Sequence, residues 1–360
     1  MTHAISWLNV PGYTPETWNL QAGCSKVSSG CDNCYALRMA IRLAHNPGIT
    51  PAAREAYRKA IERKPNDKWG WSGRVTVIEE RLEKPLRWRK PRAIFVCSMS
   101  DLFHEDVPDE VIDRVFAVAA LCPQHIFILL TKRAERMAEY TIGLQTVEGA
   151  KRFEDQRSDP MTLHRYALGN PLPNVWAGVS IENDDYAWRI GELLRTLAAV
   201  RFVSIEPMLG PVDLRPWLHS YTRTPGEGWP TPWCDAINRR GQFWPIVGGE
   251  SGPGARPMHP DWARKVRDDC AAVDVPFHFK QWGEWWYCRD AYDDHSATAY
   301  VCSTGKPPHI VGTSKPAWNV WRHEHQSCGG IHCPMYRVGR KAAGHLLDGV
   351  AHHAWPEVVG

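Results

Sequence analysis

Three cysteines near the N-terminus, Cys24, Cys31 and Cys34, constrain this chain more than any other feature. They form a C-x6-C-x2-C triplet in a loop punctuated by glycines, and this spacing brings three thiolates close enough to bind one inorganic centre. A structural zinc ion takes four protein ligands, and a fully ligated iron–sulfur cluster takes four cysteines. A [4Fe–4S] cluster held by three cysteines therefore keeps one iron open for a cofactor or a substrate.

An open iron is the basis of S-adenosylmethionine (SAM) radical chemistry, in which the methionyl amine and carboxylate chelate that iron and an electron splits the sulfonium. Two alternatives stay open. The cysteines could belong to a zinc site completed by His45 or a distant residue, or they could be unrelated buried thiols. The flanking pattern favours the cluster, because a short strand near Trp18 precedes the loop and a helix from Tyr35 to Ala44 follows it.

Beyond that helix the sequence repeats one pattern, in which a short apolar run ends in polar residues and a helical segment follows. Near-continuous apolar strands that alternate with helices indicate a parallel sheet covered by helices. Six or seven such units favour an α/β fold of the partial (β/α) barrel type over an open sheet. The apolar runs lie at residues 92–97, 125–130, 174–179, 200–205, 244–249 and 275–279.

Polar residues at the ends of these strands form the candidate site, since (β/α) barrels carry their active sites at the carboxyl ends of the strands. Each of them also has a structural interpretation as a helix cap, a turn residue or a solvated side chain. The candidate cofactor-binding residues are Tyr35, Ser98, Ser100, Asp101, Lys132, Ser180, Glu182 and Glu206. The candidates for a substrate pocket are Glu250, Lys280 and Trp282.

The expected organisation is a barrel over residues 1–286, with insertions near 144–172 and 217–242, and a C-terminal cap over 287–360. The cap is expected to end in a helix from about Val338 to Leu347. A second metal site is an open question for four cysteines of this region, which are Cys288, Cys302, Cys328 and Cys333.

The composition sets limits on partners and compartment. The formal net charge is only +3, which does not indicate a strong polyanion binder, although the run from Arg87 to Arg92 is basic with an interleaved tryptophan.

The N-terminus shows no secretory signal, and no apolar stretch is long enough to span a membrane. Eleven cysteines are an odd number without the density of a disulfide scaffold. We therefore expect a reduced, cytoplasmic protein.

Taken together, these residues resemble a radical-SAM-like family that is associated with bacteriophages and prophages and is largely uncharacterised. The resemblance covers most of the chain, and it implies a radical-SAM barrel, a [4Fe–4S] cluster on the three cysteines, SAM as second cofactor, and a flavodoxin- or ferredoxin-like electron donor. The matching stretches include Thr17–Cys24, Gly30–Ala36, Val96–Phe103, Leu130–Arg133, Asn174–Asn183, Arg201–Pro207, Val247–Gly252, Phe279–Gly283 and Val338–Gly344.

Three features depart from the usual radical-SAM pattern. The first gap of the cysteine triplet is three residues longer than in the usual C-x3-C-x2-C. Asn33 stands where an aromatic residue usually precedes the third cysteine, with Tyr35 just after it. The sequence Gly248-Gly249-Glu250, which resembles a SAM-binding motif, comes far later than usual.

The sequence thus predicts a radical SAM enzyme that cleaves SAM and abstracts hydrogen from a substrate. The phage association points to a nucleobase in DNA or RNA that is modified, rearranged or repaired, with Arg87, Arg89, Lys90 and Arg92 as backbone contacts. Two alternatives remain, a zinc-stabilised non-catalytic protein that binds nucleic acid or a partner, and a radical SAM enzyme that acts on a small metabolite.

Overall fold

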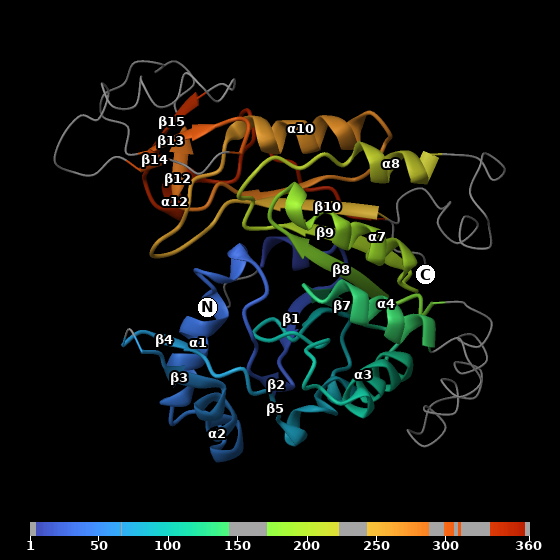
Figure 1. Cartoon of the computed structure of the whole chain (residues 1–360). Coiled ribbons are helices and arrows are strands. Elements are labelled where there is room, and N and C mark those ends of the chain that lie inside the picture. Colours follow the sequence, from blue (N-terminus) through green and yellow to red (C-terminus); the bar gives the residue numbers. More distant parts are fainter. Residues whose placement is uncertain are drawn as a thin grey trace. The chain divides into compact units, whose positions relative to one another are not determined.

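The structure is a computed structural model that describes residues 5–65, 67–143, 171–222, 243–287, 299–305, 309–310 and 332–356. These residues form a mixed α/β fold around a seven-stranded sheet of order β1-β6-β7-β8-β9-β10-β11 (Figure 1). The pairs β1–β6, β6–β7, β7–β8 and β10–β11 are parallel. The strands are β1 Thr14–Trp18, β6 Arg92–Val96, β7 Ile126–Thr131, β8 Val175–Ile181, β9 Val200–Ile205, β10 Phe243–Gly248 and β11 His278–Gln281.

The strands join the sheet in the order in which they occur along the chain, with helices between them, as in a partial (β/α) barrel. Contacts divide the chain into two units. Unit 1 comprises residues 1–180, 189–202 and 357–360, and unit 2 comprises residues 181–188 and 203–356. Each unit is described separately below.

Unit 1 packs its helices through small residues. Helix α1 (Tyr35–Ala44) buries three alanines at four-residue spacing, and these pack on the alanines of α2 (Pro51–Ala60) in one apolar cluster. Thr50 caps α2 by accepting a hydrogen bond from Ala53 N at 3.2 Å. The other helices of this part of the sequence are α3 Asp109–Leu121, α4 Ala134–Gly143 and α7 Trp188–Arg195.

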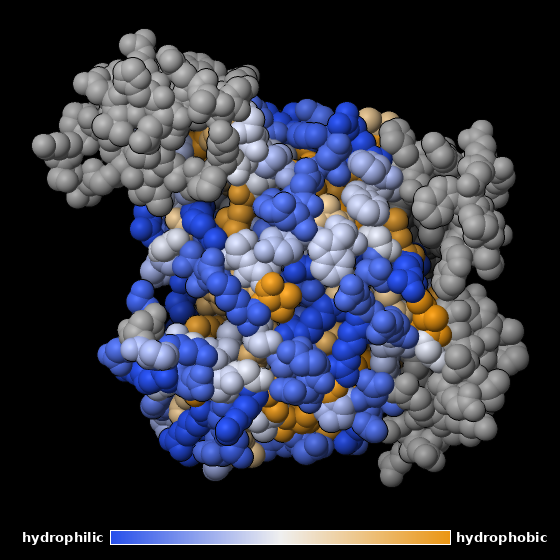
Figure 2. All heavy atoms as spheres, in the orientation of Figure 1, coloured by the Kyte–Doolittle hydropathy of each residue, from blue (hydrophilic) through white to orange (hydrophobic). Residues whose placement is uncertain are grey.

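The strands of unit 1 are buried almost throughout, as the near-continuous apolar runs predict. Phe202 occupies the space above Gly178, where a Cβ atom would lie 2.5 Å from the phenyl ring. Trp7 packs on the other side of the same core, with ring centroids 5.0 Å from Phe95 and 5.9 Å from Phe202. Figure 2 shows that one face of the molecule is largely hydrophilic, with scattered hydrophobic residues.

Short strands extend unit 1 beyond the main sheet. Two antiparallel strand pairs flank the cysteine loop and α2. One pair is β2 (Gln21–Ala22) with β5 (Thr76–Val77), and the other is β3 (Ile61–Arg63) with β4 (Trp69–Trp71).

In unit 2, helices α8 (Arg215–Thr222) and α10 (Pro260–Ala271) lie close to each other, and α10 also contacts β10 (Figure 1). A second, antiparallel sheet has the order β12-β15-β13-β14. Its strands are β12 Trp285–Tyr287, β13 Ala299–Cys302, β14 His309–Ile310 and β15 His332–Arg337.

The C-terminal segment of unit 2 pairs with the last strand of the main sheet. Phe279 N donates to His352 O at 2.8 Å, and Ala354 N donates to Phe277 O at 3.2 Å. His278 and His353 form an antiparallel bridge between these two contacts. Residues 352–354 thereby cover the backbone edge of β11 that faces away from β10.

The predicted pattern of strands and helices is confirmed from β1 to α10, but the expected helix over Val338–Leu347 is wrong. Only α12 (Arg340–Ala343) is helical there, because Gly339 and Gly344 adopt φ values of +86° and +74° on either side of it. Most of the expected insertions near 144–172 and 217–242 lies outside the described residues, and the boundary at residue 286 stays a prediction. No helix in the described part of the chain is long and apolar enough to cross a membrane.

Candidate cofactor site

The three cysteines lie in a loop of unit 1 between β2 and α1. Gly23 begins this loop with φ +110°, and a Cβ atom there would lie 2.0 Å from Arg74 O, so only glycine fits. Cys34 is the N-cap residue of α1. All three thiols are partly exposed, whereas other thiols such as Cys97 are buried in the core. Their partial exposure argues against the alternative of thiols buried in a core.

The three thiols are close enough to affect each other's ionisation. Burial, followed by the charge of Asp101, raises the pKa of Cys24 to about 12, and Cys31 and Cys34 contribute in the same direction. Burial also raises the pKa of Cys34, with a further contribution from Cys31. Negative charge placed on one thiol thus disfavours ionisation of the others.

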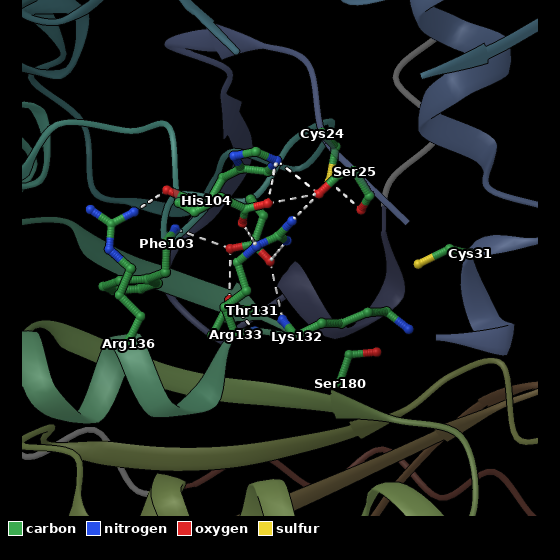
Figure 3. Close-up of polar contacts among 12 residues, drawn as sticks. Cys24, Ser25, Cys31, Phe103, His104, Thr131, Lys132, Arg133, Arg136 and Ser180 are labelled. Atoms are coloured by element: carbon green, nitrogen blue, oxygen red, sulfur yellow. Dashed lines mark hydrogen bonds and ion pairs between the residues drawn. The ribbon is translucent and has the colours of Figure 1, made fainter. Parts of the chain in front are cut away.

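Lys132, which follows β7, is directed at the cysteine loop. Its Nζ donates to Ser28 Oγ at 2.9 Å, and Ser28 Oγ lies 3.9 Å from Cys31 Sγ. Figure 3 shows the Lys132 side chain extended toward the side of the loop that carries Cys31. Burial would raise the pKa of Cys31, but the Lys132 ammonium and hydrogen bonds from the backbone of Val27 and Ser28 outweigh it and lower this pKa. Burial in turn lowers the pKa of Lys132 to about 8. This predicted site residue therefore supplies positive charge near the Cys31 thiol.

Arg133, the next residue, ties the Cys24 side of the loop to the strand ends. Its guanidinium donates to Asp101 Oδ2 at 3.0 Å, to Glu105 Oε2 at 2.8 Å and to Ser25 Oγ at 2.6 Å. The Asp101 carboxylate, almost fully buried, also accepts from Thr131 Oγ1 at 2.7 Å and from the backbone of Phe103 and Lys132. Asp101 is thus saturated by contacts within the protein.

Ser25 and His104 lie in contact next to Cys24, yet they do not form a nucleophile and its base. His104 Nδ1 accepts a hydrogen bond from Asp106 N at 3.1 Å, so the neutral ring carries its proton on Nε2. Nε2 lies 2.9 Å from Ser25 Oγ and therefore donates to it. A histidine that donates to a serine cannot accept its proton, so the pair holds the cysteine loop in place.

The other predicted strand-end residues of unit 1 lie around the same loop. The Tyr35 hydroxyl donates to the Ser98 carbonyl, which links the start of α1 to the residue after β6. Ser98 Oγ donates to Asn19 Oδ1 at 3.1 Å. The Ser100 side chain is hydrogen-bonded to the buried Cys97, and Ser180, near the end of β8, is also buried.

The described residues offer no complete ligand set for a single metal ion. In the described residues, no three Cys, His, Asp or Glu side chains converge as ligands of one ion. Each cysteine of an iron–sulfur cluster binds a different iron, so cluster ligands lie further apart than the ligands of one zinc ion. His45 is excluded as the missing zinc ligand, because the ten residues of α1 place it about 15 Å from Cys34.

Unit 2 carries a second polar group at the ends of β9, β10 and β11. Lys280 Nζ donates to both carboxylate oxygens of Glu206, at 2.6 and 2.8 Å, and both side chains are about one fifth exposed. Gln281 Nε2 donates to Ser251 Oγ at 2.9 Å and to Gly249 O at 3.1 Å. Glu206 and Lys280, predicted for a cofactor and a substrate separately, thus form one ion pair.

Three further candidates in unit 2 are buried. The Glu250 carboxylate accepts from the backbone N, Nε and Nη2 of Arg256 at 2.7–2.8 Å, which folds the loop after β10. Trp282 is 1% exposed and donates from its indole to Leu346 O at 2.8 Å, so it is a core residue. Glu182 is also buried, and its carbonyl accepts from Leu209 N at 2.8 Å.

The basic run lies at the other end of β6 from the candidate site. β6 starts at Arg92 and ends just before Cys97, so its five residues separate the run from Ser98 by about 17 Å. Arg92 pairs with Glu16 at 2.8 Å and stacks on Trp88, 4.8 Å from the ring centroid. Arg92 is thus part of the fold of unit 1.

The second cysteine group is only partly described. Cys302 and Cys333 lie in β13 and β15, where Val301 pairs with Cys333. Cys288 and Cys328 lie outside the described residues. The second metal site therefore stays an open question.

Several residues of the site were not predicted from the sequence, namely Asn19, Ser25, His104, Glu105 and Arg133. The sequence held two signals for them. Arg133 follows Lys132 directly, and Asn19 follows β1 at the same edge as Ser98. The contacts of Ser25 with His104 and Arg133 join residues that are 79 and 108 positions apart, so no local sequence pattern predicts these contacts.

Comparison with known proteins gives one family. Residues 9–356 match the model of a family described as "Protein of unknown function (DUF5131)". No curated protein and no solved structure matches the chain.

Proposed function

The chain belongs to the DUF5131 family, whose function is not established, and from its own residues we propose that it is a radical SAM enzyme. Cys24, Cys31 and Cys34 would hold a [4Fe–4S] cluster, and SAM would bind at its open iron. When bound, these groups supply one-electron cleavage of the SAM sulfonium, which gives a 5′-deoxyadenosyl radical that abstracts hydrogen from a substrate.

The observation that carries the proposal is that one loop holds three partly exposed thiols close enough to shift one another's pKa, beside a largely buried lysine. The thiols raise each other's pKa, and Lys132 lowers that of Cys31. Cluster ligation requires thiolates, and a nearby cation favours them. A largely buried ammonium directed at a cysteine loop is expected beside an anionic metal centre.

The surrounding residues of unit 1 fix the loop on both sides. Arg133 holds the Cys24 side through Ser25, and Lys132 holds the Cys31 side through Ser28. The role of Asp101 is to orient Arg133 and the turn after β7, since its oxygens are used within the protein. Ser100, which follows β6, and Ser180, near the end of β8, are the hydroxyl residues that we assign to contacts with SAM.

In unit 2, we propose that the Glu206–Lys280 pair binds a charged group of a ligand. An ammonium and a carboxylate that already face each other match a zwitterion, because each can exchange its partner for the opposite charge of the ligand. The partial exposure of both side chains leaves them accessible for that exchange. A nucleic-acid substrate gains no support from the run at Arg87–Arg92, which lies at the other end of β6.

Anaerobic reconstitution tests the cluster. We expect about four irons per chain, a broad visible absorption, and a change in the electron paramagnetic resonance signal of the reduced cluster when SAM is added. Cys24→Ala, Cys31→Ala and Cys34→Ala should each abolish iron binding. Cys122→Ala, which removes a buried thiol outside the loop, is the matched control and should keep the iron.

The alternative of a zinc protein makes the opposite prediction. Stoichiometric zinc without iron after anaerobic reconstitution would overturn the enzyme proposal. Production of 5′-deoxyadenosine from SAM and dithionite by the wild type, and its loss in the cysteine variants, is the matching activity test.

A further inference from the structure

The surface next to the cysteine loop is apolar at its centre. Tyr35 is 50% exposed, Val27 40% and Met39 37%, although all three are large hydrophobic side chains. Tyr35 and Met39 are four residues apart in α1 and therefore lie on one face of the helix. Val27 lies in the cysteine loop that leads into the same helix. Large exposed hydrophobic residues on one helix face, with a third in the adjoining loop, indicate an interaction surface.

The rim of this surface is basic. Helix α1 contains Arg38 and Arg42 and no acidic residue, and Lys26 in the loop is 63% exposed. Arg42 Nη1 lies 3.8 Å from Met39 Sδ, so the guanidinium borders the apolar centre directly. The acidic residue of the loop, Asp32, pairs with Lys26. We call Lys26, Val27, Tyr35, Arg38, Met39 and Arg42 together the α1 face.

We propose that the α1 face is the docking surface for a small acidic protein that carries a one-electron centre, a flavin or an iron–sulfur cluster. This inference rests on the proposed function, because reductive cleavage of SAM takes one electron that the substrate does not supply. In the docking step the carrier is oxidised by one electron and the cluster is reduced by one, and no bond forms or breaks.

The position of the α1 face suits this role. Cys34 caps α1 and Tyr35 follows it, so the surface begins at a proposed cluster ligand. An apolar centre with a basic rim complements an acidic partner, since charged rims steer association and apolar centres hold the complex. Arg87 and Lys90, which are also exposed and basic, lie at the far end of β6 from the cysteines.

Association is measured first, on the chain as purified, with a fluorescently labelled acidic flavodoxin as the probe. We expect binding that weakens with salt and becomes about tenfold weaker in the double variant Arg38→Glu/Arg42→Glu. The double variant Arg87→Glu/Lys90→Glu makes the same change in net charge elsewhere and should bind like the wild type. Absence of binding by the wild type, or equal losses in both variants, would overturn the proposal.

Reduction of the reconstituted cluster is measured second, by the loss of its visible absorption after rapid mixing. Reduced flavodoxin should act about tenfold more slowly on Arg38→Glu/Arg42→Glu, whereas dithionite, which needs no docking surface, should reduce all variants equally. If the variant instead loses affinity for single-stranded DNA and keeps its rate with flavodoxin, the face binds nucleic acid and the proposal is wrong. Failure to assemble any cluster would count against the proposed function, while the binding result still decides this inference.

Discussion

The ammonium of Lys132 and the hydroxyl of Ser28 lie 2.9 Å apart, and this contact joins the end of β7 to the loop that carries the three cysteines. The same ammonium is the main cause that lowers the pKa of Cys31 against the effect of burial. The contact therefore has a consequence that is measurable without any metal.

Lys132→Met should slow alkylation of Cys31 in the metal-free, reduced protein. A lower pKa means more thiolate near neutral pH, so removal of the ammonium raises the pKa and reduces the reactive fraction. We expect the rate at pH 8 to fall roughly fivefold, as measured by iodoacetamide labelling and peptide mass spectrometry. Lys26→Met, which removes an exposed lysine of the same loop, is the control. An unchanged Cys31 rate in Lys132→Met would show that the two groups do not interact.

Asp101→Asn should destabilise the fold by on the order of 3 kcal/mol. The substitution keeps the shape of the side chain, but it leaves Arg133 in a largely buried position with one charged partner fewer. Asp106→Asn, at an exposed carboxylate of the same segment, should change the free energy of unfolding by less than about 0.5 kcal/mol. Urea unfolding of the two variants compares them, and equal effects would contradict the assigned role of Asp101.

Gly249→Ala should be far more disruptive than Gly248→Ala. A Cβ atom at Gly249 would lie 1.9 Å from Trp282 O, so the backbone would have to move, whereas at Gly248 it would meet the Glu206 side chain at 3.2 Å. We expect a loss of about 3 kcal/mol for the first substitution and under about 1 kcal/mol for the second. Similar thermal midpoints for both variants would show that the ends of β10 and β11 are less tightly packed than described.

Unit 2 should lose stability as the pH falls below about 6.5. Burial, followed by the charges of His353 and Lys280, lowers the pKa of His278 to about 3, so the folded state favours the neutral ring. Between about pH 6.5 and pH 3, His278 binds a proton in the unfolded chain but stays neutral in the folded state. The contribution of His278 to the free energy of unfolding is therefore complete above that range and is lost within it. Between pH 7.5 and pH 5 the loss should be about 2 kcal/mol.

The measurement for this prediction is urea unfolding at pH 7.5 and pH 5, monitored in the wild type and in His278→Gln. The substitution should reduce the difference between the two pH values, although it also lowers stability at both. His45→Gln, at an exposed histidine of unit 1, should keep the wild-type difference. A pH dependence that is the same in all three proteins would refute the role of His278.

Much of the fold could be predicted because its strands are marked by continuous apolar runs. Every residue of β8 and β9 is buried, and burial on both faces removes the alternation that other strands show. The helix expected in the tail after β15 was mispredicted because its composition gives no sign of where the helix ends. Its sequence has helical residues, but Gly339 and Gly344 take positive φ values that end the helix after four residues.

The candidate site was predictable only where residues follow the strands directly. Lys132 and Asp101 were found in this way, but the role of Asp101 as the partner of Arg133 depends on contacts across the fold. Likewise Glu206 and Lys280 are 74 positions apart, and nothing in either local sequence indicates that they form one pair. Strand-end position identifies candidates, whereas their grouping requires the three-dimensional structure.

The pairing of residues 352–354 with β11 has a practical consequence for anyone who shortens the chain. A parallel sheet that ends in a bare strand offers unpaired N–H and C=O groups to other molecules, and such edges promote association between copies. The short tail strand blocks that route, with the indole of Trp244 anchoring it through a 2.8 Å hydrogen bond to Ala354 O. Chains shortened to end before His352 should therefore be prone to aggregation even when the cysteine loop is intact.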